Sequence, residues 1–173
     1  MLFEMKFQVD HLDRALAAAR QAISHPEEML TKIGENLKPV NHARHNAGLA
    51  PDGSKWKELS PLTPKEGRKG GILAKSGRML QSFNYQIHGN DTLVMGFDGA
   101  TESMRADWHH SGTDPYVITP KKAKALKFGG IYRKRVNHPG LPARPLVGFP
   151  ESDQKLAGEV VQDYLQVILN RVR

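Results

Sequence analysis

Two close pairs of histidines are the first residues in this chain whose type suits metal binding, since histidine is the commonest metal-ligating side chain. His109 and His110 are adjacent, and His42 and His45 are three positions apart. Adjacent side chains point to opposite faces of a strand or diverge by about 100° on a helix, so His109 and His110 cannot easily share one ion. No carboxylate is placed to complete a site with the other pair, and the H-E-x-x-H pattern is absent. We therefore expect histidines of the surface or of an interface, with no metal and no cofactor.

Phosphate binding and nucleophilic catalysis also lack the patterns that they need. The stretch GRKGGILAKSGR resembles a phosphate-binding loop, but that motif requires glycine directly before Lys-Ser, and Ala74 stands there. Ser76 has no neighbouring histidine or aspartate in the sequence and no G-x-S-x-G around it, so we expect it to cap a helix. Asp107 lies near His109, and a single such pair is weak support for general-base chemistry. The sequence therefore predicts a protein that is not an enzyme.

Basic residues gather late in the chain, in one lysine-rich cluster and in a second cluster beside Tyr132. In a strand over IYRKRV, Arg133 and Arg135 would share a face and could contact a phosphate backbone. The alternative, which we favour, is a solvated edge whose charges prevent aggregation. The candidates for a DNA-channel or partner patch are Lys121, Lys122, Lys124, Arg133 and Arg135, with Lys127 and Lys134 beside them.

Two further side chains are of types that recognise other proteins. Trp56 stands in a polar stretch, where an aromatic side chain either anchors another chain or folds back onto its own core. Arg144 lies in LPARPLVGF between Pro142 and Pro145, which fix the backbone and suit the edge of a sheet. Its planar guanidinium could pair with a carboxylate on a neighbouring subunit or on its own chain.

Composition indicates a soluble globular protein rather than a disordered or disulfide-rich one. The chain has 173 residues, of which 39% are hydrophobic and 25% charged, so we expect a single domain over residues 1–173. It has no cysteine, which fits a reducing cytoplasm. The N-terminal MLFEMKFQVD does not have the pattern of a signal peptide, and no apolar run reaches the roughly 18 residues of a membrane span. The net charge of +7 suits solubility, an acidic partner or nucleic acid.

Periodicity along the chain alternates between helix and strand patterns. Leu12, Leu16, Ala19 and Ile23 form one apolar stripe of a helix, and Pro39 should kink or end the next helix. The expected elements are a strand at 3–9, helices at 11–23 and from 27 onward, a long flexible loop at 46–71, a short helix at 76–83, a hairpin at 84–97, a helical turn at 103–110 ending at Gly112, a strand at 131–136, and a final helix starting near Ser152 or Asp153.

This order predicts an α+β fold. We expect a mostly antiparallel β-sheet, with N-terminal helices and a long C-terminal helix packed on it and with the extended loop outside. The final helix has the strongest pattern, with two neighbouring apolar rows. These rows are Leu156, Val160, Tyr164, Ile168 and Val172 in the first, and Val161, Leu165 and Leu169 in the second.

Five segments together resemble the phage virion morphogenesis family, also called the tail completion proteins, which is the group of Mu-like protein G and protein S. They follow the family's order over residues 50–155. The segments are APDGSKWKELSPLT for DG-x-x-W-x-x-L-S-x-x-T, ILAKSGRMLQSF for L-x-x-S-G-x-L-x-x-S-(I/F), VMGF for V-x-(I/V)-G, ADWHHSGT for Y-A-x-x-H-x-x-G, and LPARPLVGFPESD for (I/L)-P-A-R-P-F-L-G with its acidic helix start.

The chain also departs from this pattern. Leu146 replaces the usual Phe, and Asp107 and Trp108 replace the usual Tyr-Ala. The stretch from YVITPKKAKALKFGG through VNHPG is similar to minor tail and head–tail joining proteins. The position of the protein within a virion is therefore left open between the tail end and the head-side connector.

The resemblance implies a structural virion protein of a tailed phage or prophage, assembled in the bacterial host cytoplasm. It would act in tail completion, as a tail terminator, and in head–tail joining at the neck. It would form a homo-oligomer, often a hexameric ring, around the channel through which DNA passes, against tail tube and connector proteins. No catalytic residue carries over, and no membrane is involved. The candidate subunit or partner contacts are Trp56, Leu59, Arg78, His109, Arg144 and Pro145. The alternative is a basic nucleic-acid-binding accessory protein.

Overall fold

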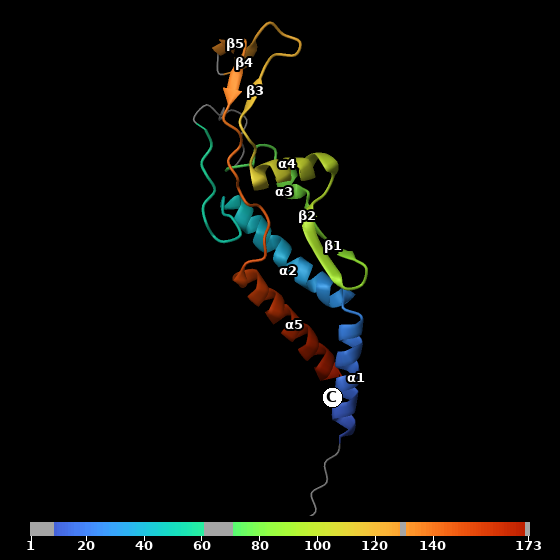
Figure 1. The fold of residues 1–173 in the computed structure, drawn as a ribbon. Helices are drawn as coiled ribbons and strands as arrows, with labels where there is room; N and C mark the ends of the chain where they lie inside the picture. The colour runs from blue at the N-terminus through green and yellow to red at the C-terminus, as the bar shows by residue number, and fades with distance from the viewer. Residues whose placement is uncertain (1–8, 61–70, 129–130, 172–173) are drawn as a thin grey trace, which may run out of the picture. The chain divides into compact units, whose positions relative to one another are not determined.

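The computed structural model describes residues 9–60, 71–128 and 131–171 and confirms the α+β class (Figure 1). The predicted hairpin and the helix that ends at Gly112 are both present. Within the described residues, the helices are α1 Asp10–Ser24, α2 Glu27–Asn46, α3 Arg78–Gln81, α4 Ala100–Ser111 and α5 Glu151–Arg171. The strands are β1 Phe83–His88, β2 Thr92–Phe97, β3 Tyr116–Ile118, β4 Leu126–Phe128, β5 Ile131–Arg133 and β6 Val136–His138.

The described strands pair as three two-stranded sheets rather than as one larger sheet: β1 with β2, β3 with β6, and β4 with β5. The single strand predicted over IYRKRV is therefore wrong. Arg133 pairs with Leu126 in one sheet, whereas Val136 pairs with Ile118 in another. The chain changes partner between them, so Arg135 lies outside both strands and does not share a strand face with Arg133. The strand expected at 3–9 lies outside the described residues except for Val9, which precedes α1 in a helical conformation.

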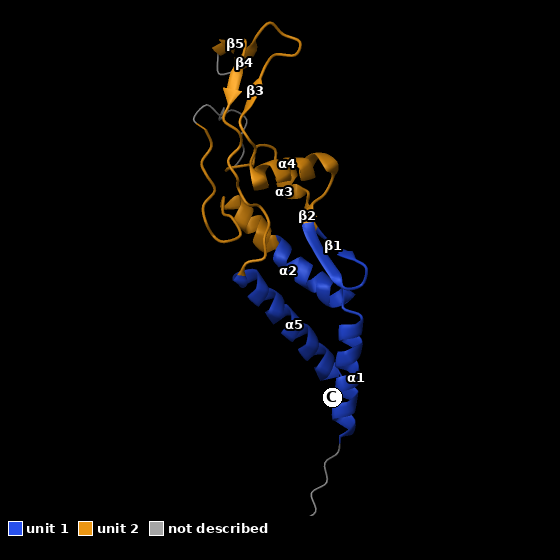
Figure 2. Cartoon of the chain, viewed as in Figure 1, with its two compact units in different colours: residues 1–38, 85–95, 151–173 blue, residues 39–84, 96–150 orange. Residues whose placement is uncertain are grey.

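The chain divides into two compact units, each made of separate segments (Figure 2). Unit 1 comprises residues 1–38, 85–95 and 151–173, and unit 2 comprises residues 39–84 and 96–150. The boundary within α2 falls at Pro39, where we expected a kink or an end. The helix instead continues to Asn46, although proline removes one backbone hydrogen bond. Buried residues before and after the proline, Leu37 and Asn41, keep both parts of the helix packed.

In unit 1, α1 packs on α5 with a face other than the one predicted. Most of the apolar stripe that the sequence indicates is open: Leu12, Leu16 and Ile23 are 57%, 55% and 62% exposed, whereas Ala19 is half-buried. Ala22 is buried instead, at 8% exposure. Small side chains allow two helix axes to approach closely, so the alanine face of α1 makes the contact and the larger apolar residues are left outside.

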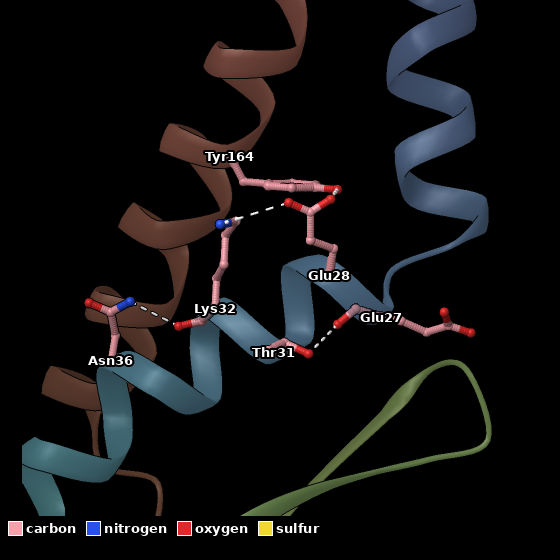
Figure 3. A network of polar contacts seen from close by, with 6 residues as sticks. All are labelled: Glu27, Glu28, Thr31, Lys32, Asn36 and Tyr164. Carbon is pink, nitrogen blue, oxygen red and sulfur yellow. Dashed lines mark hydrogen bonds and ion pairs between the residues drawn. The ribbon is translucent and has the colours of Figure 1, made fainter.

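Polar contacts join α2 to α5 in the same unit (Figure 3). The Tyr164 hydroxyl donates to the Glu28 carboxylate at 3.2 Å, and the Lys32 ammonium lies 3.8 Å from the same carboxylate group. The Thr31 hydroxyl and the Asn36 amide donate to backbone carbonyls of α2 itself, at 2.8 Å in each case. These groups are largely exposed, so they orient the helices more than they stabilise them.

The core of the described part of the chain lies in unit 2. Its fully packed residues come from distant segments that meet around Trp56, which is 4% exposed. The buried cluster is Ala50, Trp56, Met79, Ala106 and Leu146, with Ile72, Leu73 and Phe97 packed against it.

Candidate assembly site

The five sequence segments that we distinguished meet in this core. Each contributes at least one side chain: Trp56 from the first, Met79 from the second, Phe97 from the hairpin, Ala106 from α4, and Leu146 from the last. The segments lie between residues 50 and 153 of the chain, and only folding brings them together. The five segments therefore form one packing site. This site positions the surface residues around it.

Trp56 folds back onto its own chain, which was one of the two alternatives left open for it. A turn precedes it, closed by the bridge between Leu49 and Lys55 and by the Trp56 amide, which donates to the Gly48 carbonyl at 2.8 Å. Its indole Nε1–H donates to the Pro145 carbonyl at 2.9 Å. Residues 47–60 of the predicted flexible loop thus contain a hydrogen-bonded turn with Ala50 and Trp56 buried, and residues 61–70 lie outside the described part.

Arg144 is buried beside this tryptophan, at 3% exposure. Its guanidinium donates to the backbone carbonyls of Lys57 at 2.9 Å and Glu58 at 3.1 Å. Burial lowers the pKa of Arg144, and the nearby Glu58 carboxylate opposes that shift. Within its own chain, the side chain therefore holds the segment that follows Trp56 through backbone carbonyl oxygens rather than through a carboxylate.

Histidines cover another side of the tryptophan. The ring of His45 meets the Trp56 ring edge-on at 5.1 Å between centroids. Burial, and then the neighbouring His42 and His109, lower the pKa of His45 from 6.5 to about 4. Burial, and then Arg144, lower the pKa of His109. Neither ring nitrogen of His45 has a hydrogen-bond partner within the described residues. Their surroundings therefore disfavour protonation of the His45 and His109 rings.

Hydrogen bonds connect α4 to the proline-flanked segment at several successive residues. The Arg144 amide donates to the His109 carbonyl at 2.7 Å, and the Leu146 amide donates to Nδ1 of His110 at 3.2 Å. Thr113 and Leu141 exchange two bonds, at 2.9 and 3.0 Å. The two adjacent histidines thus accept hydrogen bonds through different atoms, His109 through its backbone carbonyl and His110 through its ring Nδ1. The sequence did not reveal His110 and Thr113 as partners of this segment, although both lie in the ADWHHSGT stretch.

The surface of unit 2 is hollowed beside this core into a groove of about 1160 Å³. Four of the six predicted contact residues line it: Leu59, Arg78, His109 and Arg144. The other two, Trp56 and Pro145, are the pair joined by the indole hydrogen bond. Glu102 lies in the groove wall between two cations, 2.7 Å from Arg105 and 4.0 Å from Arg78. The structure therefore gathers all six candidates around one place.

One short expectation changes at this site. Ser76 does not cap α3, since Gly77 holds the N-cap position in a left-handed conformation without a side-chain hydrogen bond. Among the described residues, no group of three or more histidine or acidic side chains is arranged to hold a metal ion. No helix among them is long and apolar enough to cross a membrane.

The basic candidates lie apart from the core, on a projecting part of unit 2. We call residues 116–128 and 131–138 the basic arm; it comprises β3 to β6 and the turn between β3 and β4. Its basic side chains are all exposed: Lys121, Lys122, Lys124, Lys127, Arg133, Lys134 and Arg135. The base of the arm, including Lys127 and His138, also lines the groove.

A core built from the dispersed motif segments, beside a groove lined by four of the candidate contact residues, fits the family that those segments resemble. Comparison with family models agrees: the model of the phage virion morphogenesis family matches residues 7–166. The chain therefore belongs to this family, which is a phage structural family and not an enzyme family. Comparisons with curated proteins and with solved structures found no match.

Proposed function

We propose that this protein completes the phage tail and contributes to head–tail joining as a homo-oligomeric ring around the DNA channel, hexameric in its assembled form. The observation that carries the proposal is that the family's motif segments build one packed core and place Leu59, Arg78 and His109 along one groove. A groove of this kind, held by buried hydrogen bonds, suits contact with a neighbouring tail or connector protein.

Self-association is supported by unit 1. The open stripe of α1, with Leu12, Leu16 and Ile23, is an apolar surface of the kind that marks a protein interface. A groove of about 370 Å³ between α2 and α5 is lined by Val160, Val167 and Ile168 together with five charged side chains, which are Glu28, Lys32, Glu35, Asp163 and Arg171. A stripe and a groove at different places on one chain form a heterologous contact, which closes into a ring when the rotation between copies permits.

Light scattering over a range of protein concentrations tests the proposal, with and without tail tubes that lack their terminal ring. We expect a ring, or a monomer that binds to tube ends and caps them. A chain that stays monomeric and leaves tube ends free at all concentrations would contradict the proposal.

A pair of variants on α1 tests the self-association surface. Leu16→Glu places a charge in the apolar stripe and should abolish ring formation while leaving the monomer folded. Ala17→Glu is the matched control, because Ala17 is exposed next to it but points to a different side of the helix. Equal assembly of both variants would show that the stripe is not the contact.

A further inference from the structure

The net charge of this protein is located in one projecting element. Seven of the 25 lysines and arginines lie in the basic arm or its flanking turn, and none of the 18 aspartates and glutamates does. The rest of the chain therefore carries as many basic as acidic side chains. A net charge of +7 is thus not a general property of the surface but the property of one short segment.

The charges of the arm are not balanced by acidic side chains within the described part of the chain. Two basic side chains of the groove wall, Arg78 and Arg105, share the carboxylate of Glu102. Those of the arm contact no carboxylate among the described residues. Arg133 donates to the Tyr132 carbonyl at 3.2 Å, and Arg135 donates to the Asn137 side-chain oxygen at 3.3 Å. These charged groups are consequently available to an external partner or are solvated by water.

The arm also has a shape that suits a nucleic acid. Its strands pair with each other as two narrow antiparallel ribbons, β3 with β6 and β4 with β5. A two-stranded ribbon fits the major groove of B-form DNA, and lysines and arginines along it can neutralise phosphates. Tyr132 is 60% exposed and lies beneath the Lys127 ammonium, 5.6 Å from the ring centroid. The arm also exposes Tyr116, Val117 and Ile131, which are apolar anchors of the kind that an acidic protein surface uses, so the experiment below includes an acidic polypeptide as a competitor for the same charges.

We propose that the basic arm binds the phosphate backbone of duplex DNA without reading its sequence. The proposal goes beyond tail completion and does not depend on ring formation, because each chain carries its own arm. The favoured alternative from the sequence, charges that merely protect a strand edge from aggregation, predicts solubility but no affinity.

The experiment measures binding of the full chain to a fluorescein-labelled 30-base-pair duplex of arbitrary sequence, by fluorescence anisotropy in 50 to 200 mM KCl. We expect affinity to fall steeply with salt, with a logarithmic slope of about −0.9 for each phosphate neutralised. The triple variant Lys121→Gln, Lys122→Gln, Lys124→Gln should bind at least about tenfold more weakly at 100 mM KCl and reduce the magnitude of the slope by about 2 to 3.

A matched control separates the arm from the overall charge. Arg14→Gln, Arg20→Gln, Lys155→Gln removes three charges from α1 and α5, outside the basic arm, and it should leave affinity within about twofold, since none of the phosphate contacts assigned to the arm is lost. Equal losses in the two triple variants would overturn the proposal, because net charge alone would then explain binding.

Two other outcomes would also overturn it. The first is an arm variant that aggregates but binds DNA as the parent chain does, which assigns the charges to edge protection. The second is binding to poly-glutamate as tight as to the duplex at the same salt, which assigns the arm to an acidic protein surface. Light scattering on each variant distinguishes a loss of binding from a loss of solubility.

Discussion

The indole N–H of Trp56 donates a hydrogen bond to the backbone carbonyl of Pro145, 89 positions farther along the chain, at 2.9 Å. Next to it, the Arg144 guanidinium returns two hydrogen bonds to the residues that follow the tryptophan. The two segments therefore bind each other in both directions. The segment of Trp56 supplies the indole donor and the carbonyls of Lys57 and Glu58, and the segment of Arg144 supplies the guanidinium donor and the Pro145 carbonyl. The groove of unit 2 is built on this exchange, so its stability depends on both side chains.

Trp56→Phe should destabilise the protein by about 2 kcal/mol, because the Pro145 carbonyl loses its donor and the smaller ring leaves a gap in a packed core. Urea unfolding monitored by circular dichroism measures the change. Trp108→Phe is the control, since Trp108 is 44% exposed and its replacement should change stability by less than about 0.5 kcal/mol. Equal effects of the two substitutions would contradict the central role of Trp56.

Arg144→Lys should cost about 2 to 3 kcal/mol although it keeps the charge, because an ammonium cannot reproduce the planar geometry that serves two carbonyls. The segment after Trp56 would be released, so trypsin should cleave after Lys57 faster than in the parent chain. Arg105→Lys, at a half-exposed position, is the control and should alter neither measurement appreciably.

Replacing Arg144 also distinguishes a role within one chain from a role between subunits. If Arg144 acts within its own chain, Arg144→Ala should melt earlier and still assemble at temperatures where it is folded. Loss of assembly at unchanged stability would instead place its function at an interface.

Stability should fall as the pH drops from 7 to 4, through His45. Its pKa is about 4 in the folded chain and 6.5 otherwise, so below pH 6.5 the unfolded chain binds more protons and gains stability relative to the fold. We expect a loss of about 2 kcal/mol, less than the full linkage value because the ring keeps slight contact with solvent. His45→Phe should flatten this dependence in thermal melts, whereas His88→Gln, on an exposed strand position, should not. An unchanged pH dependence in His45→Phe would refute the assignment.

Gly140 lies where the segment before Arg144 approaches the segment that follows α4, and a substitution there tests how close this approach is. It has a φ of +86°, and a Cβ placed there would overlap the Thr113 carbonyl oxygen and lie 2.9 Å from the Asp114 carbonyl carbon. Gly140→Ala should therefore destabilise by about 3 kcal/mol or more, from left-handed strain and backbone overlap together.

Gly53 is the matched control for that substitution. Its φ is +82°, but no described heavy atom lies within 4 Å of the position that an alanine methyl group would take there. Gly53→Ala should cost only about 1 to 2 kcal/mol, the strain of the left-handed conformation alone. Thermal unfolding of both variants gives the comparison, and similar losses would mean that the close approach at Gly140 is relaxed in solution.

The sequence by itself determined the elements whose signals are local. Periodicity located α1 and α5, the turn residues Gly89 to Asp91 located the β1–β2 hairpin, and Gly112 located the end of α4. The order of the motif segments also predicted the family, because such motifs are readable as linear patterns. Local backbone preferences and side-chain periodicity suffice for these features.

Tertiary structure alone decided which faces are buried and which side chains meet. The alanine face of α1 packs while Leu16 is exposed, because close helix approach favoured small residues over the more apolar stripe. Trp56 became a core residue because Pro145 offers an acceptor for its N–H, so that its burial leaves no unpaired donor. Strand IYRKRV divides because two different partners compete for its two ends. Each outcome depends on contacts between residues far apart in the chain, which periodicity and spacing do not encode.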